Sequence, residues 1–301
     1  MLLSILIGGK NDNYAADDNG KGGVNKRLEL TLNKMVDNLK RLGKSDVEVV
    51  VCDWGSEIKI SDELVKERHP NLKFVYVSPD ITKKYNRGTT YSIVHPYNVS
   101  YRNSKGEYVV FWDSDCFMPY EEIERLYNFV KALSDNKEKK FYQGSRFHIP
   151  RIGYVDAESY KDVDEFLKTC VIDPVNAKQP TVDADNFVDE HMLRHNKISV
   201  DYFSGGAMAV LMHREIAEES SCWWEELTYW GWQDIELHTR LKRRYPCGGD
   251  LEDFGIKFFH LYHYENFNKN KPVMNDSLIT NRFHANEKNW GLADEKLEVI
   301  S

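Results

Sequence analysis

One short segment constrains the fold more than any other: the β-branched and aromatic run from Tyr108 to Trp112, which ends directly in Asp113-Ser114-Asp115. An uninterrupted apolar run of this length is typical of a strand that is buried on both faces of a parallel sheet. Ligands of open α/β sheets bind at the carboxyl ends of such strands. The sequence therefore predicts that Asp113 and Asp115 lie at the mouth of a binding site.

The spacing of these two carboxylates suggests their chemistry. Two hard oxygen ligands on a chain that leaves a strand can hold a divalent cation and leave its other positions to diphosphate oxygens. The alternative is a polar turn that only closes the strand, because Asp and Ser are common turn residues. An isolated Asp-x-Asp favours the turn, since short motifs match by chance. The rest of the chain therefore has to decide between the two.

Strand and helix signals alternate over the first 115 residues. Apolar runs predict strands at residues 2–7, 47–52, 72–77 and 108–112. Helical spacing or acidic first turns predict helices at residues 26–42, from 61, at 91–104 and from about 119. Repeated βα units imply a parallel sheet. The predicted fold class is α/β, with a mostly parallel nucleotide-binding sheet flanked by helices.

The second half of the chain is less regular. Residues 150–200 are rich in Asp, contain three prolines and have weak periodicity, which predicts long connections and short helices over the site. A strand-like run is expected at 202–210, where Gly205 and Gly206 allow a close approach of backbone to a ligand. The run from Trp230 to Leu237 is expected to lead into a helix that continues through Leu241.

Composition excludes several classes of protein. With 301 residues, 41% hydrophobic and 13% aromatic, the chain can bury a sizeable core. A net charge of −8 predicts no bulk nucleic-acid binding. Five scattered cysteines without a Cys-x-x-Cys pair favour a reduced protein. No apolar run approaches the about 20 residues that span a bilayer. A cytoplasmic protein is expected, and peripheral attachment to a membrane stays open.

Four motifs occur in one order along the chain: Cys52-Asp53-Trp54-Gly55-Ser56, Asp113-Ser114-Asp115, Ser204-Gly205-Gly206 and Trp230-Gly231-Trp232-Gln233-Asp234-Ile235-Glu236-Leu237. Together they resemble the metal-dependent glycosyltransferases of the GT-A fold, in particular family 2 and the related galactosyl- and chondroitin-polymerising enzymes. The resemblance implies a single domain over residues 1–301. Its nucleotide-sugar-binding half is residues 1–115, and its acceptor-binding and catalytic half is residues 116–301.

The resemblance also implies an activity. Such an enzyme moves a hexosyl or N-acetylhexosaminyl group from a nucleotide diphosphate donor, with UDP-sugars as the first choice, to a hydroxyl of a carbohydrate or other acceptor. Mn²⁺ or Mg²⁺ is the implied cofactor. Asp115 is the first candidate for a metal ligand, and Asp113 is expected nearer the ribose or a bridging water. A histidine is expected to join them, His263 rather than His260, which lies within an apolar run and is expected in the core.

The catalytic and acceptor residues are implied by the helix-start motif. Asp234 is the expected general base, which needs hydrogen-bond reach to the acceptor hydroxyl and implies inversion. Glu236 is expected to bind or orient the acceptor, with an ordinary first-turn helix acid as an equal alternative. Gln233 replaces a common Glu and keeps a hydrogen bond without the charge. Trp230 and Trp232 are expected to stack on acceptor sugars, against the alternative of core packing.

The donor residues are implied by the strand ends and by the glycines. Asp53 is the expected acceptor for a uracil N–H or a ribose hydroxyl. Gly8 permits a close approach of the backbone to the nucleotide, and Asn11 in the same loop can contact it. Asn98 aligns with the Asn that precedes the metal strand in the family, and Gly206 belongs to the Gly pair of the later strand.

Some residues depart from the family pattern. Trp54 stands at the second acid of its turn, where an indole can stack on a base. Tyr97 replaces an Arg, so the basic contact to the donor is absent or comes from Arg102 or Lys10. The altered first loop at residues 8–14, Trp54 and Gln233 keep a catalytically degenerate nucleotide- or carbohydrate-binding protein open. A retaining transferase of the same fold is a second alternative. A sugar-1-phosphate nucleotidyltransferase is the third alternative, but its basic Gly-rich first loop is absent.

Overall fold

The protein is described by a computed structural model that covers residues 1–14, 23–144, 146–148, 209–260, 275, 280 and 282–301. Its main sheet has eight strands in the order β11-β3-β2-β1-β4-β8-β6-β9. The strands are β1 (Leu3–Gly9), β2 (Val47–Trp54), β3 (Leu72–Val77), β4 (Tyr108–Trp112), β6 (Phe141–Gln143), β8 (Val210–His213), β9 (Cys247–Asp250) and β11 (Glu298–Ile300). Strands β1 to β4 are parallel, whereas β8 and β11 run antiparallel to their neighbours β4 and β3.

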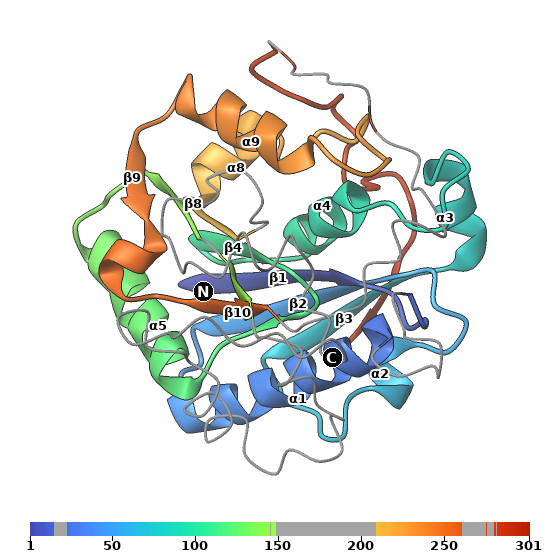
Figure 1. Ribbon diagram of the computed structural model, residues 1–301, viewed down its shortest axis with the longest axis horizontal. Coiled ribbons are helices and arrows are strands. Elements are labelled where there is room, and N and C mark those ends of the chain that lie inside the picture. Colours follow the sequence, from blue (N-terminus) through green and yellow to red (C-terminus); the bar gives the residue numbers. More distant parts are fainter. Residues whose placement is uncertain (15–22, 145, 149–208, 261–274, 276–279, 281) are drawn as a thin grey trace, which may run out of the picture.

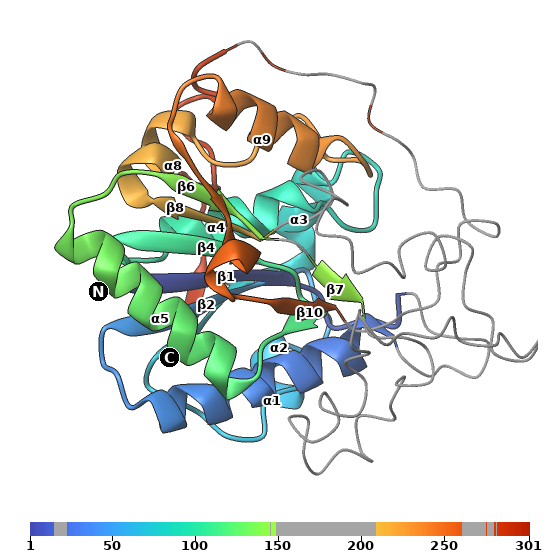
Figure 2. The ribbon, with the colours of Figure 1, turned by 60° about the vertical axis from the view of Figure 1, so that its left-hand side comes forward.

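A second, small sheet has the order β5-β10-β7. Its strands are β5 (Cys116–Phe117), β7 (Arg146–His148) and β10 (Phe258–His260). Strand β5 follows the acidic turn after β4 and pairs antiparallel with β10, so that His260 is opposite Cys116. Figure 2 shows β7 and β10 beside the main sheet. This pairing brings a segment from the C-terminal part of the chain next to the acidic turn.

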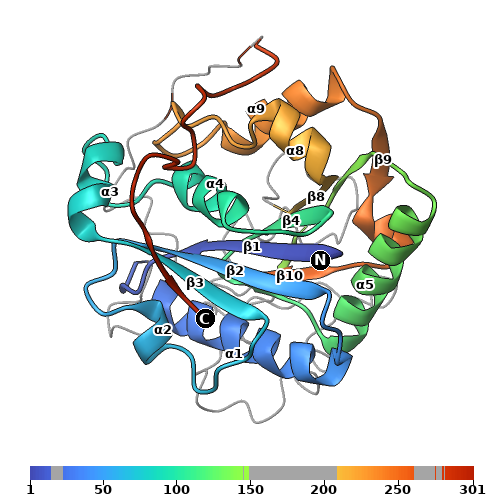
Figure 3. The ribbon, with the colours of Figure 1, turned by 180° about the vertical axis from the view of Figure 1, so that it is seen from behind.

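Helices cover both faces of the main sheet (Figures 1 and 3). One face carries α1 (Val24–Leu42) and α5 (Tyr120–Asp135), and the other carries α4 (Val94–Arg102), α8 (Arg214–Ser220) and α9 (Gln233–Lys242). The shorter helices are α2 (Ile60–Glu63), α3 (Pro79–Tyr85) and the 3₁₀ helix η2 (Leu251–Phe254). The two-sided cover explains why the central strands are continuous apolar runs rather than alternating ones.

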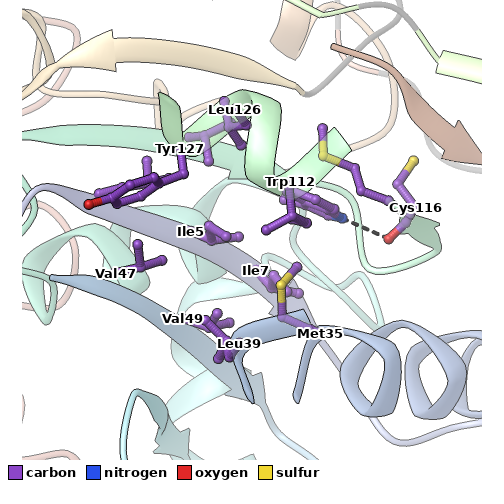
Figure 4. Close-up of a cluster of buried hydrophobic side chains, with 14 of the residues drawn as sticks. Ile5, Ile7, Met35, Leu39, Val47, Val49, Trp112, Cys116, Leu126 and Tyr127 are labelled. Atoms are coloured by element: carbon purple, nitrogen blue, oxygen red, sulfur yellow. Dashed lines mark hydrogen bonds between the residues drawn. The ribbon is translucent and has the colours of Figure 1, made fainter. Parts of the chain in front are cut away.

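Successive residues of one strand enter two different cores. In β1, Ile5 and Ile7 pack toward α1 and α5, whereas Leu6 packs on the side of α4. Figure 4 shows the first core, where Trp112 at the end of β4 also donates an Nε1 hydrogen bond of 2.7 Å to the Cys116 carbonyl. Burying one Ile or Leu side chain contributes about 1.5–3 kcal/mol to the stability of the folded state. The core therefore also holds the chain on both sides of the acidic turn.

The predicted α/β class and mostly parallel sheet are confirmed. All four strands predicted in the first 115 residues are present, and β3 has the predicted bounds. The strand expected at 202–210 falls almost entirely on residues outside the described ranges, and β8 begins at the last residue of that span, Val210. Residues 202–208 lie outside the described residues. The short strands β6, β7, β9 and β11 were not predicted, because runs of three or four residues carry little periodicity.

Candidate active site

The carboxyl ends of three parallel strands bring the predicted donor residues to one edge of the sheet. Gly9 at the end of β1 pairs with Asp53 at the end of β2, and Ile7 pairs with Trp112 at the end of β4. Because Asp113 directly follows Trp112, its carboxylate belongs to the same edge. Ligands of open α/β sheets bind at such an edge.

The acidic turn gathers three groups that can ligate a cation. One ligand atom each of Asp113, Asp115 and Cys116 lies within 4.8 Å of the others. The Asp115 carboxylate is half-buried and the Cys116 thiol is buried. The Cys116 N–H donates to the Asp113 carbonyl at 3.1 Å, which closes the turn. Carboxylate oxygens suit Mn²⁺ and Mg²⁺, and a thiol is a softer ligand. The donor set therefore fits a divalent cation.

Two nitrogens flank the carboxylate of Asp115. The Nε of Arg27, on the first turn of α1, is 3.5 Å from Asp115 Oδ2. The Nε2 of His260 is 3.4 Å from Asp115 Oδ1. His260 is buried, as expected for an apolar run, but it borders the acidic turn rather than being only a core residue. His263, the predicted third ligand, lies outside the described residues. Sequence reasoning therefore undervalued His260 and missed Arg27.

Tyr97 is the hydrogen-bond donor to the other carboxylate. Its hydroxyl donates to Asp113 Oδ1 and to the Trp112 carbonyl, both at 3.2 Å. Burial and the charge of Asp113 raise the pKa of Tyr97, so the phenol stays protonated and remains a donor. Arg102 was a candidate for the basic contact to the nucleotide-sugar donor, and the structure contradicts this. Its guanidinium donates to the carbonyls of Trp290 and Lys288.

Asp53, the predicted acceptor for a uracil N–H or a ribose hydroxyl, is buried against the turn that follows β2. Its Oδ2 accepts the N–H of Ile60 at 2.8 Å and its Oδ1 accepts that of Ser56 at 3.3 Å. Burial raises the pKa of Asp53, and these hydrogen bonds act against the rise. With the residue only 1% exposed, a direct contact with a nucleotide requires that one oxygen be uncovered on binding.

The first loop is packed closely at its glycine. A Cβ on Gly8 would lie 2.7 Å from the Cβ of Pro96 and 3.3 Å from the Tyr91 hydroxyl. Gly8 therefore allows α4 and Tyr91 to approach β1. The Asn11 N–H donates to Ser56 Oγ at 2.8 Å and its side chain donates to the Ile58 carbonyl at 3.1 Å. Asn11 thus ties the first loop to the turn after β2.

Two further predicted contacts have structural roles instead. Asn98 is fully buried, accepts the Trp223 N–H at 3.0 Å and donates to the Trp223 carbonyl at 2.8 Å, so it joins α4 to the segment before α9. Trp54 was expected to be able to stack on a base, but it is buried and stacks on His95 with ring centroids 5.5 Å apart. Gly206 lies outside the described residues.

The predicted base lies on a helix start that is held by its loop. Asp234 is half-buried on the first turn of α9, after two left-handed residues, Gly231 (φ 84°) and Trp232 (φ 71°). Asn275 holds this loop, since it accepts the Tyr229 N–H at 3.0 Å and its own N–H donates to the Trp230 carbonyl at 2.9 Å. The loop therefore has a defined course into the helix.

The tryptophans near this helix divide between surface and core. Trp230 is 42% exposed, whereas Trp223 is completely buried. Trp224 and Trp232 are half-buried. Gln233 is also buried, and its side-chain amide donates to the Tyr229 carbonyl. Trp230 is therefore the most exposed of these tryptophans, and the Gln233 side chain holds the loop that leads into α9.

Glu236 differs from its predicted role. It is completely buried, and Arg240 donates to both of its oxygens, at 2.8 Å and 3.1 Å. Arg240 also donates to the carbonyls of Ser220 and Cys222, at 2.6 Å and 2.7 Å. Arg240 thus joins α9 to the end of α8, and Glu236, in the same helix, holds the Arg240 guanidinium in place. Glu236 is neither an exposed first-turn acid nor placed to touch an acceptor.

Fold and site together define the class of protein: an α/β domain of the GT-A type, with an acidic turn after its fourth strand. Residues 24–136, which include that turn, match the family model described as Glycosyl transferase family 2. The resemblance to family 2 glycosyltransferases seen in the sequence is thus confirmed for this part of the chain.

Solved structures of S. aureus TarS are among those similar to this chain. TarS 1–349 in complex with UDP has a TM-score of 0.49 and 13% identity, over 87% of this chain and 61% of that chain. The same fragment with UDP-GlcNAc has a TM-score of 0.45 and 12% identity, over 88% and 60%. The chain therefore spans about three fifths of the length of these proteins. No curated protein matches the sequence. Within the described ranges, no helix has the length and apolar character to cross a membrane.

Proposed function

We propose that this protein transfers a sugar from a nucleotide diphosphate donor, with UDP-sugars as the first choice, to the hydroxyl of a carbohydrate or other acceptor. The observation that carries the proposal is the acidic turn Asp113-Ser114-Asp115 at the carboxyl end of β4, within a family 2 domain. In this proposal residues 1–115 bind the donor, and residues 116–301 supply the acceptor site and the base.

Asp113 and Asp115 would hold the cation, Mn²⁺ or Mg²⁺, with Cys116 and His260 beside them. When bound, the cation supplies positive charge that stabilises the departing diphosphate. The protein's own contribution is to hold the two carboxylates in place. Tyr97 orients Asp113 by its hydroxyl hydrogen bond, and the turn is closed between β4 and β5.

Asp234 is the proposed base. A carboxylate on the first turn of a helix is favoured in its ionised form by the helix dipole, and a base must be ionised to accept a proton. Asp234 would take the proton of the acceptor hydroxyl while that oxygen attacks the sugar carbon and the diphosphate leaves. Direct displacement of this kind inverts the configuration. The exposed indole of Trp230 would support the apolar face of the acceptor.

Thermal unfolding with nucleotides tests the donor site. UDP, GDP, CMP and ADP are added separately, with and without Mn²⁺, because a ligand that binds the native state stabilises it, by about 2.7 kcal/mol at 100 times its Kd. We expect one diphosphate to raise the Tm in a Mn²⁺-dependent manner. Asp115→Asn should abolish the effect of Mn²⁺. Asp80→Asn, an equal change of charge at an exposed carboxylate on α3, is the matched control and should preserve it.

Product analysis separates the alternatives. Release of the free nucleotide diphosphate from a nucleotide sugar, with or without an acceptor, identifies a transferase. Release of pyrophosphate from a nucleoside triphosphate and a sugar phosphate identifies a nucleotidyltransferase instead. Nucleotide binding without transfer or hydrolysis identifies a degenerate binding protein. The anomeric configuration of the product decides between inversion and retention.

A further inference from the structure

Arg27 places a permanent positive charge inside the site. Arg27 is only 4% exposed, and its Nε is 3.5 Å from Asp115 Oδ2. Its neighbour in the helix, Leu28, packs against Gly9, since a Cβ on that glycine would lie 2.8 Å from a Leu28 methyl group. The packing of α1 on the end of β1 therefore holds this first turn against the edge of the sheet where the acidic turn lies.

The charge balance at Asp115 follows from this position. The guanidinium lies at one oxygen of the carboxylate, and the His260 ring lies at the other. Arg stays protonated throughout the physiological pH range, so its charge cannot be released when a cation arrives. Because the carboxylate is only 14% exposed, water screens the repulsion between Arg27 and a cation incompletely. A cation that binds to Asp115 must therefore compete with Arg27.

We propose that Arg27 is a positioning residue that holds Asp115 and lowers the affinity of the acidic turn for a free divalent cation. Cation binding then depends on the diphosphate, whose negative charges outweigh the repulsion by Arg27. By linkage, the cation raises the affinity for the nucleotide by the same factor. This inference rests on the proposed function, because it concerns the same cation and the same donor.

Binding of Mn²⁺ by calorimetry, alone and in the presence of saturating UDP, tests the inference without any measurement of turnover. An opposite charge within about 4–6 Å changes the affinity of a carboxylate for a proton about tenfold or more, and we expect a similar factor for a cation. Arg27→Met should therefore bind Mn²⁺ alone about tenfold more tightly than the wild type. The coupling between Mn²⁺ and UDP should fall by about the same factor.

Two control variants isolate the effect. Arg27→Lys keeps the charge and should preserve the coupling. Lys26→Met makes the same change of charge one residue away, at a side chain that pairs with Glu29 and is half exposed, and it should leave Mn²⁺ binding unchanged. Cooperative thermal unfolding checks that each variant is folded. Arg27→Gln replaces the Met variant if the latter does not fold.

Several results would overturn the inference. One is an Arg27→Met protein that binds Mn²⁺ alone no more tightly than the wild type. Another is an Arg27→Met protein that loses UDP binding even at saturating Mn²⁺, which makes Arg27 a direct diphosphate contact. The wild type alone also provides a test, because equal Mn²⁺ affinity with and without UDP contradicts the coupling. Absence of binding of UDP, GDP, CMP and ADP to the wild type refutes the proposed function instead.

Discussion

The buried ion pair of Glu236 and Arg240 gives a prediction that separates a structural role from a catalytic one. Replacing Glu236 with Ala leaves the Arg240 guanidinium buried, with only the carbonyls of Ser220 and Cys222 as acceptors. Removing one partner of a buried pair costs about 3–5 kcal/mol. Because two carbonyls remain, we expect the lower end, about 3 kcal/mol. Glu236→Gln keeps one oxygen acceptor, so its expected loss is about 2 kcal/mol, in the range of a hydrogen bond to a charged group.

The assay is urea unfolding at pH 7. If the unfolding free energy falls by about 3 kcal/mol per M of urea, a loss of about 3 kcal/mol of stability lowers the urea midpoint by about 1 M. Glu226→Gln is the matched control, because Glu226 also forms a two-bond pair, with Arg87, but is 57% exposed. An exposed pair contributes about 0–1 kcal/mol, so this variant should lose little.

A double variant and a binding measurement complete the test. Glu236→Leu with Arg240→Met removes both charges, and it should recover most of the stability that the single Ala variant loses. Mn²⁺-dependent UDP binding should persist in the folded Glu236→Gln protein. Two results together would refute a structural role for Glu236. The unfolding free energy of Glu236→Gln would lie within about 0.5 kcal/mol of the wild-type value, and its KM for the acceptor would be raised, because Glu236 would then contact substrate.

Three further predictions follow from other contacts. Asp234→Asn should lower turnover by roughly 10² or more and leave Mn²⁺-dependent UDP binding intact; unchanged turnover in steady-state assays excludes Asp234 as the base. Trp230→Ala should raise the KM for the acceptor with little change in Tm, because this side chain is 42% exposed, whereas Trp223→Ala at a buried position should cost about 3–5 kcal/mol of unfolding free energy. Burial lowers the pKa of His95 from 6.5 to about 4, so the unfolded chain binds a proton that the folded chain does not between these values. The unfolding free energy of the wild type should therefore fall by up to about 3 kcal/mol between pH 6.5 and pH 4. The unfolding free energy of His95→Phe, measured by urea unfolding at the same pH values, should fall less over this range.

Local patterns in the chain were sufficient for most of the first 115 residues. The strand runs could be recognised because both faces of the central sheet are covered, which makes each central strand continuously apolar. The position of Asp113 and Asp115 followed, since the end of a parallel strand lies at the ligand-binding edge of the sheet. The short strands β6, β7, β9 and β11 could not be recognised, because their pairing partners rather than their composition define them.

Side-chain roles were harder to predict than positions. Asp53, Asn98 and Trp54 all lie near the expected edge, yet the structure gives each of them buried partners. A motif match specifies a residue type at a place in the chain. It does not specify which backbone groups or rings from other segments will occupy that side chain.

The sequence by itself determined the α/β sheet, the place of the acidic turn and the place of Asp234 at a helix start, because these depend on periodicity and on order along the chain. Only the tertiary structure decided that Arg27 and His260 flank Asp115, that Tyr97 donates to Asp113 and that Arg240 donates to the carbonyls of Ser220 and Cys222. Contacts of this kind join segments that are distant in the chain. They depend on how helices and strands pack, and no local pattern in the sequence records that packing.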